Sequence, residues 1–120
     1  VETESGFVVA RGDLSGFLNK TLAKAGLNQK ESKDFVEFWY PRMMANQQPY
    51  FIVKFLGTKD FNKIAPLNIS PTPDTLARIF MYYQPSDFKV NLRPQIINGF
   101  KRNGFTVVEW GGTSNTVWLQ

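Results

Sequence analysis

The sequence predicts an α+β domain with two N-terminal helices packed on a mostly antiparallel or mixed β-sheet of about four to six strands. Two early stretches carry apolar residues at helical spacing, the remainder is rich in β-type runs, and most connections are short. The length of 120 residues is typical of one domain. We expect residues 1–5, which are mostly polar or acidic, to be an N-terminal tether and residues 6–120 to form a single α+β domain.

The N-terminal part is expected to hold a short strand over residues 6–11 and then the first helix. Asp13 has the residue type that caps a helix N-terminus, and Gly26 is a natural helix stop. The tripeptide Arg11-Gly12-Asp13 matches an integrin-binding motif, but a turn that leads into this helix explains it better. The apolar stripe of the helix consists of Leu14, Phe17, Leu18, Leu22 and Ala25.

A second helix is predicted to begin after Asn28. Glu31 follows Asn28 by three residues, which completes a capping-box pattern. We expect Pro41 to end or kink this helix at Tyr40, because proline lacks the amide donor and clashes with the preceding turn. The apolar stripe consists of Phe35, Val36, Phe38 and Trp39.

The middle of the chain predicts a polar connection over residues 43–49 and then a strand over 50–56. Residues 58–65 suit a short helix, capped by Thr58, with Phe61 and Ile64 facing inward. Residues 66–74 contain three prolines, so we expect a stiff, extended loop. Residues 75–83 are rich in apolar and aromatic side chains and favour a strand, although a helix is conceivable.

The C-terminal part predicts short strands separated by turns. Residues 90–97 are expected to be an edge strand, because Pro94 cannot donate to a ladder. A strand over 105–110 is followed by Gly111-Gly112, which we interpret as a strand breaker. The remaining expected elements are turns at 85–87 and 98–104 and a last strand at 116–119.

The composition excludes several kinds of chemistry. The chain has no cysteine and no histidine, so disulfides, thiolate or imidazole metal sites and His-dependent catalytic pairs are impossible. Enzymes built on other residues exist, yet we lean towards a protein without catalysis, cofactor or metal. No stretch approaches the roughly 20 apolar residues that span a bilayer. The first residue is Val1, so we expect a processed chain or a piece of a larger protein.

Several strings resemble an uncharacterised domain that recurs in predicted secreted proteins of bacteria. They are IAPLNISPTPDTLARIFM, GFTVVEWGG, GLNQKESKDFVEFWYPRM and PYFIVKFL, which together cover most of residues 6–112. The resemblance implies an extracellular or cell-envelope setting and membership of a larger protein. It implies no activity and no functional residue. Absence of cysteine fits that setting and also the cytoplasm.

Three surface features are candidates for a binding role. Prolines reduce the entropy lost when a loop is fixed on binding, which favours the loop over 66–74 as a recognition surface. A basic run within residues 89–102, with the net charge of +4, is able to attract phosphates or an acidic polymer, although a solvated edge strand explains it equally well. The candidate binding residues are Asn68, Ser70, Pro71 and Pro73 in the loop, Lys89, Arg93, Lys101 and Arg102 in the basic run, and Trp118 near the C-terminus.

Arg78 stands in an otherwise apolar strand, which predicts a structural ion pair. A buried charge needs a partner, and the guanidinium fork matches a carboxylate. Asp74 and Glu109 are the two candidate partners. An active site with these carboxylates is conceivable, but arginine would depress their pKa values and spoil a general acid.

The leading hypothesis is therefore a non-enzymatic binding module of a larger secreted or cell-envelope bacterial protein. Its partner would be another protein or an envelope polymer. The first alternative is a carbohydrate-binding or carbohydrate-active domain, in which Trp39, Trp110 and Trp118, with Tyr82 and Tyr83, form a stacking platform. The second alternative is a nucleic-acid-binding module that uses residues 89–102, without a recognised motif.

Overall fold

The structure is a computed structural model that describes residues 5–114. In chain order the elements are β1 (Phe7–Ala10), a single 3-10 turn (Arg11–Asp13), α1 (Leu14–Ala25), α2 (Gln29–Met44), β2 (Tyr50–Leu56), α3 (Thr58–Ile64), β3 (Thr75–Ser86) and β4 (Thr106–Ser114). Most of the predicted tether and the whole of the predicted strand at 116–119, with Trp118, lie outside the described residues.

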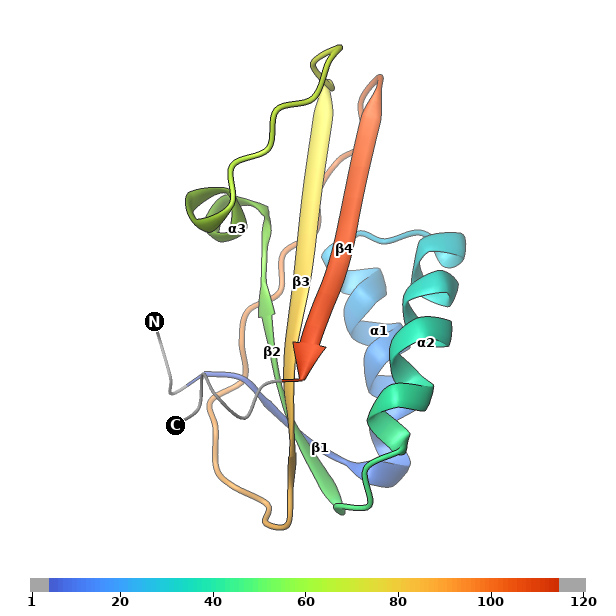
Figure 1. Ribbon diagram of the computed structural model, residues 1–120, viewed down its shortest axis with the longest axis vertical. Coiled ribbons are helices and arrows are strands. Elements are labelled where there is room, and N and C mark those ends of the chain that lie inside the picture. Colours follow the sequence, from blue (N-terminus) through green and yellow to red (C-terminus); the bar gives the residue numbers. More distant parts are fainter. Residues whose placement is uncertain (1–4, 115–120) are drawn as a thin grey trace.

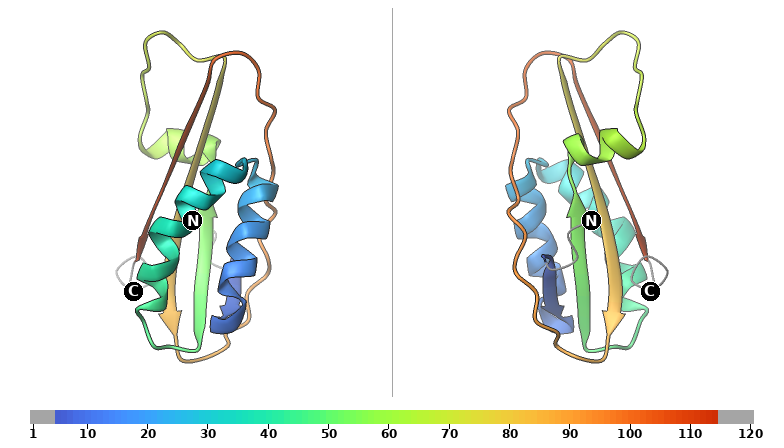
Figure 2. Two further views of the ribbon diagram at one scale, coloured as in Figure 1. Left: turned by 90° about the vertical axis from the view of Figure 1, so that its right-hand side faces the viewer. Right: turned by 90° about the vertical axis from the view of Figure 1, so that its left-hand side faces the viewer.

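The strands form one mixed sheet in the order β1-β2-β3-β4. β2 pairs antiparallel with β1 and with β3, whereas β4 runs parallel to β3. Helices α1 and α2 cover one face of the sheet, and α3 lies on the other face (Figures 1 and 2). The predicted α+β class is confirmed, and within residues 5–114 the sheet has four strands and a third helix is inserted between β2 and β3.

The core lies between the sheet and the two N-terminal helices. Side chains alternate across a strand, so every second residue of β2 and β3 faces α1 and α2. Burial of such a large apolar side chain stabilises the fold by about 1.5–3 kcal/mol. The fully or almost fully buried members are Val9 of β1, Leu14, Leu18 and Leu22 of α1, Leu27 after α1, Phe35 and Met43 of α2, Phe51 and Val53 of β2, and Ile79, Met81 and Tyr83 of β3.

The ends of α1 follow local chemistry only in part. Gly26 stops the helix with φ of 105°. The amides of Gly26 and Leu27 donate to the carbonyls of Ala23 and Leu22, each at a distance of 3.0 Å. The side chain of Asp13, in contrast, makes no capping hydrogen bond. Asp13 belongs to the 3-10 turn and has helical backbone angles, whereas a capping residue needs an extended backbone.

Helix α2 begins as predicted and ends later than predicted. The side chain of Asn28 accepts from the Glu31 amide at 2.8 Å, and the Glu31 carboxylate accepts from the Asn28 amide at 2.9 Å. The expected end at Tyr40 is wrong, because α2 continues through Pro41 to Met44. The guanidinium of Arg11 caps this end by donating to the carbonyl of Met44 at 2.8 Å and to that of Asn46. Arg11 therefore supports the last turn of α2, which follows the position where Pro41 lacks a backbone amide donor.

Strand β3 is longer than predicted and includes Pro85 and Ser86, two of the three residues of the turn expected at 85–87. Pro85 pairs with Phe51 of β2, beyond the point where β4 pairing ends at Tyr83. With a single neighbouring strand in the described structure there, one missing amide donor is tolerated.

The edge strand expected at 90–97 is not formed. Residues 87–105 instead run along the sheet as an irregular crossover segment from β3 to β4 (Figure 1). The amide of Gly6 donates to the Arg93 carbonyl at 2.8 Å. The side chain of Gln95 accepts a hydrogen bond from the amide of Phe55 at 2.8 Å and donates one to its carbonyl at 3.0 Å. These two bonds take the place of a strand partner at this part of β2.

The Gly111-Gly112 pair does not break its strand, since β4 continues to Ser114. A Cβ atom on Gly112 would lie 2.9 Å from the Met81 carbonyl oxygen and 3.1 Å from the Trp39 ring. Glycine is therefore needed for close packing of Trp39 on the sheet.

Candidate functional site

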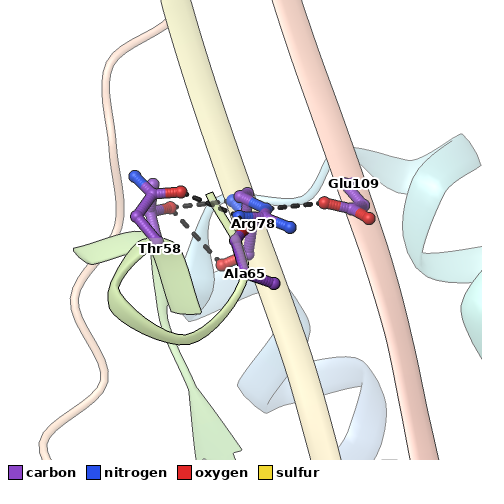
Figure 3. Close-up of polar contacts among 5 residues, drawn as sticks. Thr58, Ala65, Arg78 and Glu109 are labelled. Atoms are coloured by element: carbon purple, nitrogen blue, oxygen red, sulfur yellow. Dashed lines mark hydrogen bonds and ion pairs between the residues drawn. The ribbon is translucent and has the colours of Figure 1, made fainter. Parts of the chain in front are cut away.

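Arg78 is the centre of the most connected polar cluster among the described residues (Figure 3). It lies on β3, on the face opposite α1 and α2, and is only 3% exposed. Its Nε donates to Glu109 Oε1 on β4 at 2.6 Å, and its Nη1 donates to Asn62 Oδ1 at 2.9 Å and to the Ala65 carbonyl. One guanidinium therefore links β3 to β4 and to the end of α3.

The beginning of α3 is held to the same residue. Gly57, and not Thr58, is the N-cap of α3. Thr58 Oγ1 instead accepts from the backbone amide of Arg78 at 2.7 Å, beyond the end of β2 where that amide has no strand partner. The ring of Phe61 lies under the guanidinium, 4.1 Å from Cζ to the ring centroid. Ile64 does not face inward as predicted, because it is 67% exposed.

Asp74 does not join this cluster. Its Oδ2 accepts from the Phe105 amide at 2.8 Å, and the amides of Asp74 and Thr75 both donate to the Phe105 carbonyl. Thr75 Oγ1 exchanges two further hydrogen bonds with the backbone of Asn103. Of the two predicted partners of Arg78, the structure pairs it with Glu109 and uses Asp74 to join the start of β3 to the start of β4.

The proline loop (residues 66–74) is consequently fastened at both ends. The Ala65 carbonyl is bound by Arg78 before the loop begins, and Asp74 is bound to Phe105 where it ends. The backbone between these points is neither helix nor strand, as predicted, and the Ser70–Pro71 bond is cis. The candidate residues Asn68, Ser70 and Pro71 are exposed, and Pro73 is half-buried.

The basic run does not form one patch with four available cations. Arg102 donates to both carboxylate oxygens of Glu31 and, at 3.1 Å, to the Gly26 carbonyl, so it docks the crossover segment on the turn between α1 and α2. Lys89, Arg93 and Lys101 are exposed. They are spread over a segment that follows the sheet from one end to the other (Figure 1).

The pKa of Glu31 reflects this docking contact. Burial raises the pKa, but hydrogen bonds from Arg102 and from the Asn28 amide, with the positive charge of Arg102, lower it more. The net pKa lies below its ordinary value of 4.5. Glu31 therefore stays ionised while it caps α2 and binds Arg102.

The described tryptophans pack inward and offer no open stacking platform. The Trp110 ring lies 5.2 Å from that of Phe35, and the Trp39 ring lies 6.1 Å from that of Tyr83. Tyr82 is on the opposite face of the sheet, next to Phe80. Trp118, the remaining candidate of this kind, lies outside the described residues.

A surface hollow adjoins Arg78. It has a volume of about 450 Å³ and lies between α3, β3 and the crossover segment, with Thr58, Arg78 and Gln95 in its wall. Nε and Nη1 of Arg78 are already bound to protein acceptors. The arrangement is suited to holding the frame of the proline loop.

Comparisons with known proteins identify no relative. A scan against protein-family models gives no match, and searches of the curated proteins and of the solved structures give none either. Residues 5–114 also contain no helix that is both long and apolar enough to cross a membrane, and no group of acidic side chains arranged to hold a metal ion.

Sequence reasoning found Arg78 and Glu109 but missed their supporting residues. Asn62, Ala65 and Thr58 contact Arg78 from 13 to 20 positions away in the chain. Asn62 and Thr58 are ordinary surface residues by type, and Ala65 contributes only its backbone. The sequence did predict the short helix that carries Thr58 and Asn62, but its apolar pattern did not predict where the helix packs on the sheet.

Proposed function

We propose that this chain is a non-enzymatic, protein-binding module that presents the proline loop to its partner. The single observation that carries the proposal is the fastening of this loop at both ends by buried or backbone-directed polar contacts, while most of its middle is exposed. A loop held in this way loses little entropy on binding, which is the main cost of recognition by flexible segments.

The exposed chemistry of the loop favours a protein partner. Leu67 is 40% exposed, and Ile64, three residues earlier in the chain, is exposed still more, so exposed aliphatic side chains precede the polar Asn68 and Ser70 in the sequence. Apolar anchors surrounded by polar groups are typical of protein interfaces. The secreted or cell-envelope setting within a larger protein rests on the resemblance of the four sequence strings and is part of the same proposal.

Two alternatives receive less support. Trp39, Trp110 and Tyr83 are used in packing, which removes most of the stacking platform that a carbohydrate site would need. Arg102 is engaged with Glu31, and the other cations of the basic run are spread along the crossover segment, which disfavours a nucleic-acid groove.

Site-directed photo-crosslinking tests the proposal. A photoreactive amino acid is placed at Leu67, and a matched one at Ile96, an aliphatic residue of the crossover segment that is 88% exposed. Each labelled protein is incubated with envelope and secreted fractions of the producing cells and then irradiated. The protein with the probe at Leu67 is expected to crosslink to one discrete protein that the protein with the probe at Ile96 does not capture.

Binding of the purified partner then gives the quantitative test. Leu67→Asp is expected to weaken the affinity at least about tenfold, because it places a charge at the centre of the contact, whereas Ile96→Asp should leave affinity unchanged. Identical capture at both positions, or equal affinities of the two variants, would refute the proposal. Saturable binding on a glycan array would favour the carbohydrate alternative instead.

A further inference from the structure

Strand β4 has an edge without a strand partner in residues 5–114. It is the last strand of the sheet and spans nine residues, so its free edge is about 30 Å long. Such edges are usually protected by lysine, proline or a covering segment. The sequence TVVEWGGTS has no lysine or proline, and its one charge, Glu109, is bound to Arg78 across the sheet.

Helix α2 lies directly above this edge. Phe35 and Phe38 contact Trp110, with ring centroids 5.2 and 6.3 Å apart, and the Trp39 ring packs on Gly112. If a second molecule adds a strand to β4, the segment that packs on that strand will therefore lie next to α2.

The surface of α2 beside this edge carries a self-complementary row of side chains. Asp34, Phe38 and Arg42, here called the α2 row, are spaced four residues apart and so share one helix face. Phe38 is 41% exposed and has the Arg42 guanidinium over its ring at 3.6 Å. The Asp34 side chain is 45% exposed and accepts from Lys30 at 2.9 Å. An acid and a base thus flank an exposed aromatic ring at equal distances along the helix.

We propose that two copies of this chain associate through antiparallel pairing of their β4 edges, so that their sheets join into one. A two-fold axis near Trp110 reverses the second α2 row. The Phe38 rings then meet at the axis, and Asp34 of each copy faces Arg42 of the other. The same axis places the small Gly111 and Gly112 opposite Glu109 and Val108 of the second copy.

The charge row provides a test in which two non-associating variants restore each other. Asp34→Arg alone makes two cations face each other at both ends of the row, and Arg42→Asp alone makes two acids face each other. Each variant is expected to dissociate at least about tenfold more readily than the parent. Mixed together, one variant carries only bases and the other only acids, so a heterodimer is expected to form. Sedimentation velocity at high micromolar concentration measures each species, with circular dichroism showing that every variant is folded.

The matched control uses Lys33 and Glu37, which are also four residues apart but line the hollow between α1 and α2. Lys33→Glu and Glu37→Lys are expected to leave association unchanged. A parent chain that sediments as a monomer at every concentration overturns the proposal. Equal effects of the control variants, or no association on mixing Asp34→Arg with Arg42→Asp, overturn it as well.

Strand pairing itself is tested by a cross-link. The proposed axis sets Val107 of one copy opposite Thr113 of the other. Val107→Cys mixed with Thr113→Cys is therefore expected to give a disulfide-linked dimer under mild oxidation, and more of it than either variant alone. Absence of this preference would rule out β4 pairing even if the helices associate.

Discussion

Replacing Arg78 with methionine removes the guanidinium while keeping an unbranched apolar side chain. The lost interactions are the hydrogen bonds to Glu109, Asn62 and Ala65 and the contact with the Phe61 ring. A hydrogen bond to a charged group stabilises a fold by about 1.5–3 kcal/mol. Glu109 is 43% exposed, however, and returns to water, so its share approaches the 0–1 kcal/mol of a surface pair. We therefore expect a loss of about 3 kcal/mol in the free energy of unfolding, or about 10 °C in Tm.

The reverse deletion separates the two partners. Glu109→Gln leaves a guanidinium that is 3% exposed without its counter-charge, and we expect it to cost about 2–4 kcal/mol. In the double variant no orphan charge remains, so the total loss should fall short of the sum by about 1–3 kcal/mol. Asp74→Asn is the control, because Asp74 contacts Phe105. Its effect should add to that of Arg78→Met within about 0.5 kcal/mol.

Urea unfolding followed by tryptophan fluorescence and by far-UV circular dichroism measures these differences, with equal m values confirming a common unfolded state. A loss of less than about 0.5 kcal/mol for Arg78→Met would refute the assignment, as would strict additivity with Glu109→Gln. Arg78→Lys adds a local measurement. Lysine keeps the charge but lacks the planar fork, so it cannot hold all the acceptors that Arg78 binds. We therefore expect Arg78→Lys to speed amide exchange in the proline loop while lowering the free energy of unfolding by less than Arg78→Met does.

Three further outcomes are expected. Gly112→Val should lower the free energy of unfolding by about 1–3 kcal/mol in urea, because its Cβ meets the Met81 carbonyl and the Trp39 ring, whereas Gly111→Val, whose nearest neighbour is a Phe80 ring edge at 3.3 Å, should cost less. The pKa of Glu31 is lowered in the folded protein, so the ionised side chain contributes fully to the free energy of unfolding above the ordinary pKa of 4.5, and this contribution is lost as the pH falls through the folded pKa. In acid titrations, the difference in free energy of unfolding between the parent and Glu31→Gln should therefore shrink below pH 4.5. Calorimetry with zinc should give no submicromolar site of defined stoichiometry, because the chain has no cysteine and no histidine.

Elements that depend on neighbouring residues were predictable from the sequence. The capping box of Asn28 and Glu31, the stop at Gly26 and the bounds of β2 all follow from chemistry within a few positions. The end of α2 was not predictable, because Arg11 supports it from 33 residues away. Gly111-Gly112 indicated a break by local rules, whereas the need for glycine at position 112 arises from the Met81 carbonyl and the Trp39 ring, which are distant in the chain.

The candidate site divides in the same way. An arginine among apolar strand residues predicts a carboxylate partner, and Glu109 is that partner. Choosing between Glu109 and Asp74 required the parallel register that sets Arg78 beside Glu109, and sequence patterns do not specify register between distant strands. The contacts from Asn62 and Ala65 depend on where α3 packs, so the fastening of the proline loop could not have been found before the fold.

The proline loop and the β4 edge lie at different places on the molecule, and their geometry is connected. β3 and β4 are parallel, so both begin at the end of the sheet where the proline loop meets Phe105. Antiparallel pairing of two β4 strands would place these ends, and hence the two loops, at opposite ends of the joined sheet. A dimer would then present two copies of the loop far apart and facing separate partners. Such an arrangement strengthens binding to a repeated or polymeric target by effective concentration, and it adds nothing for a single soluble partner that is too small to reach both loops.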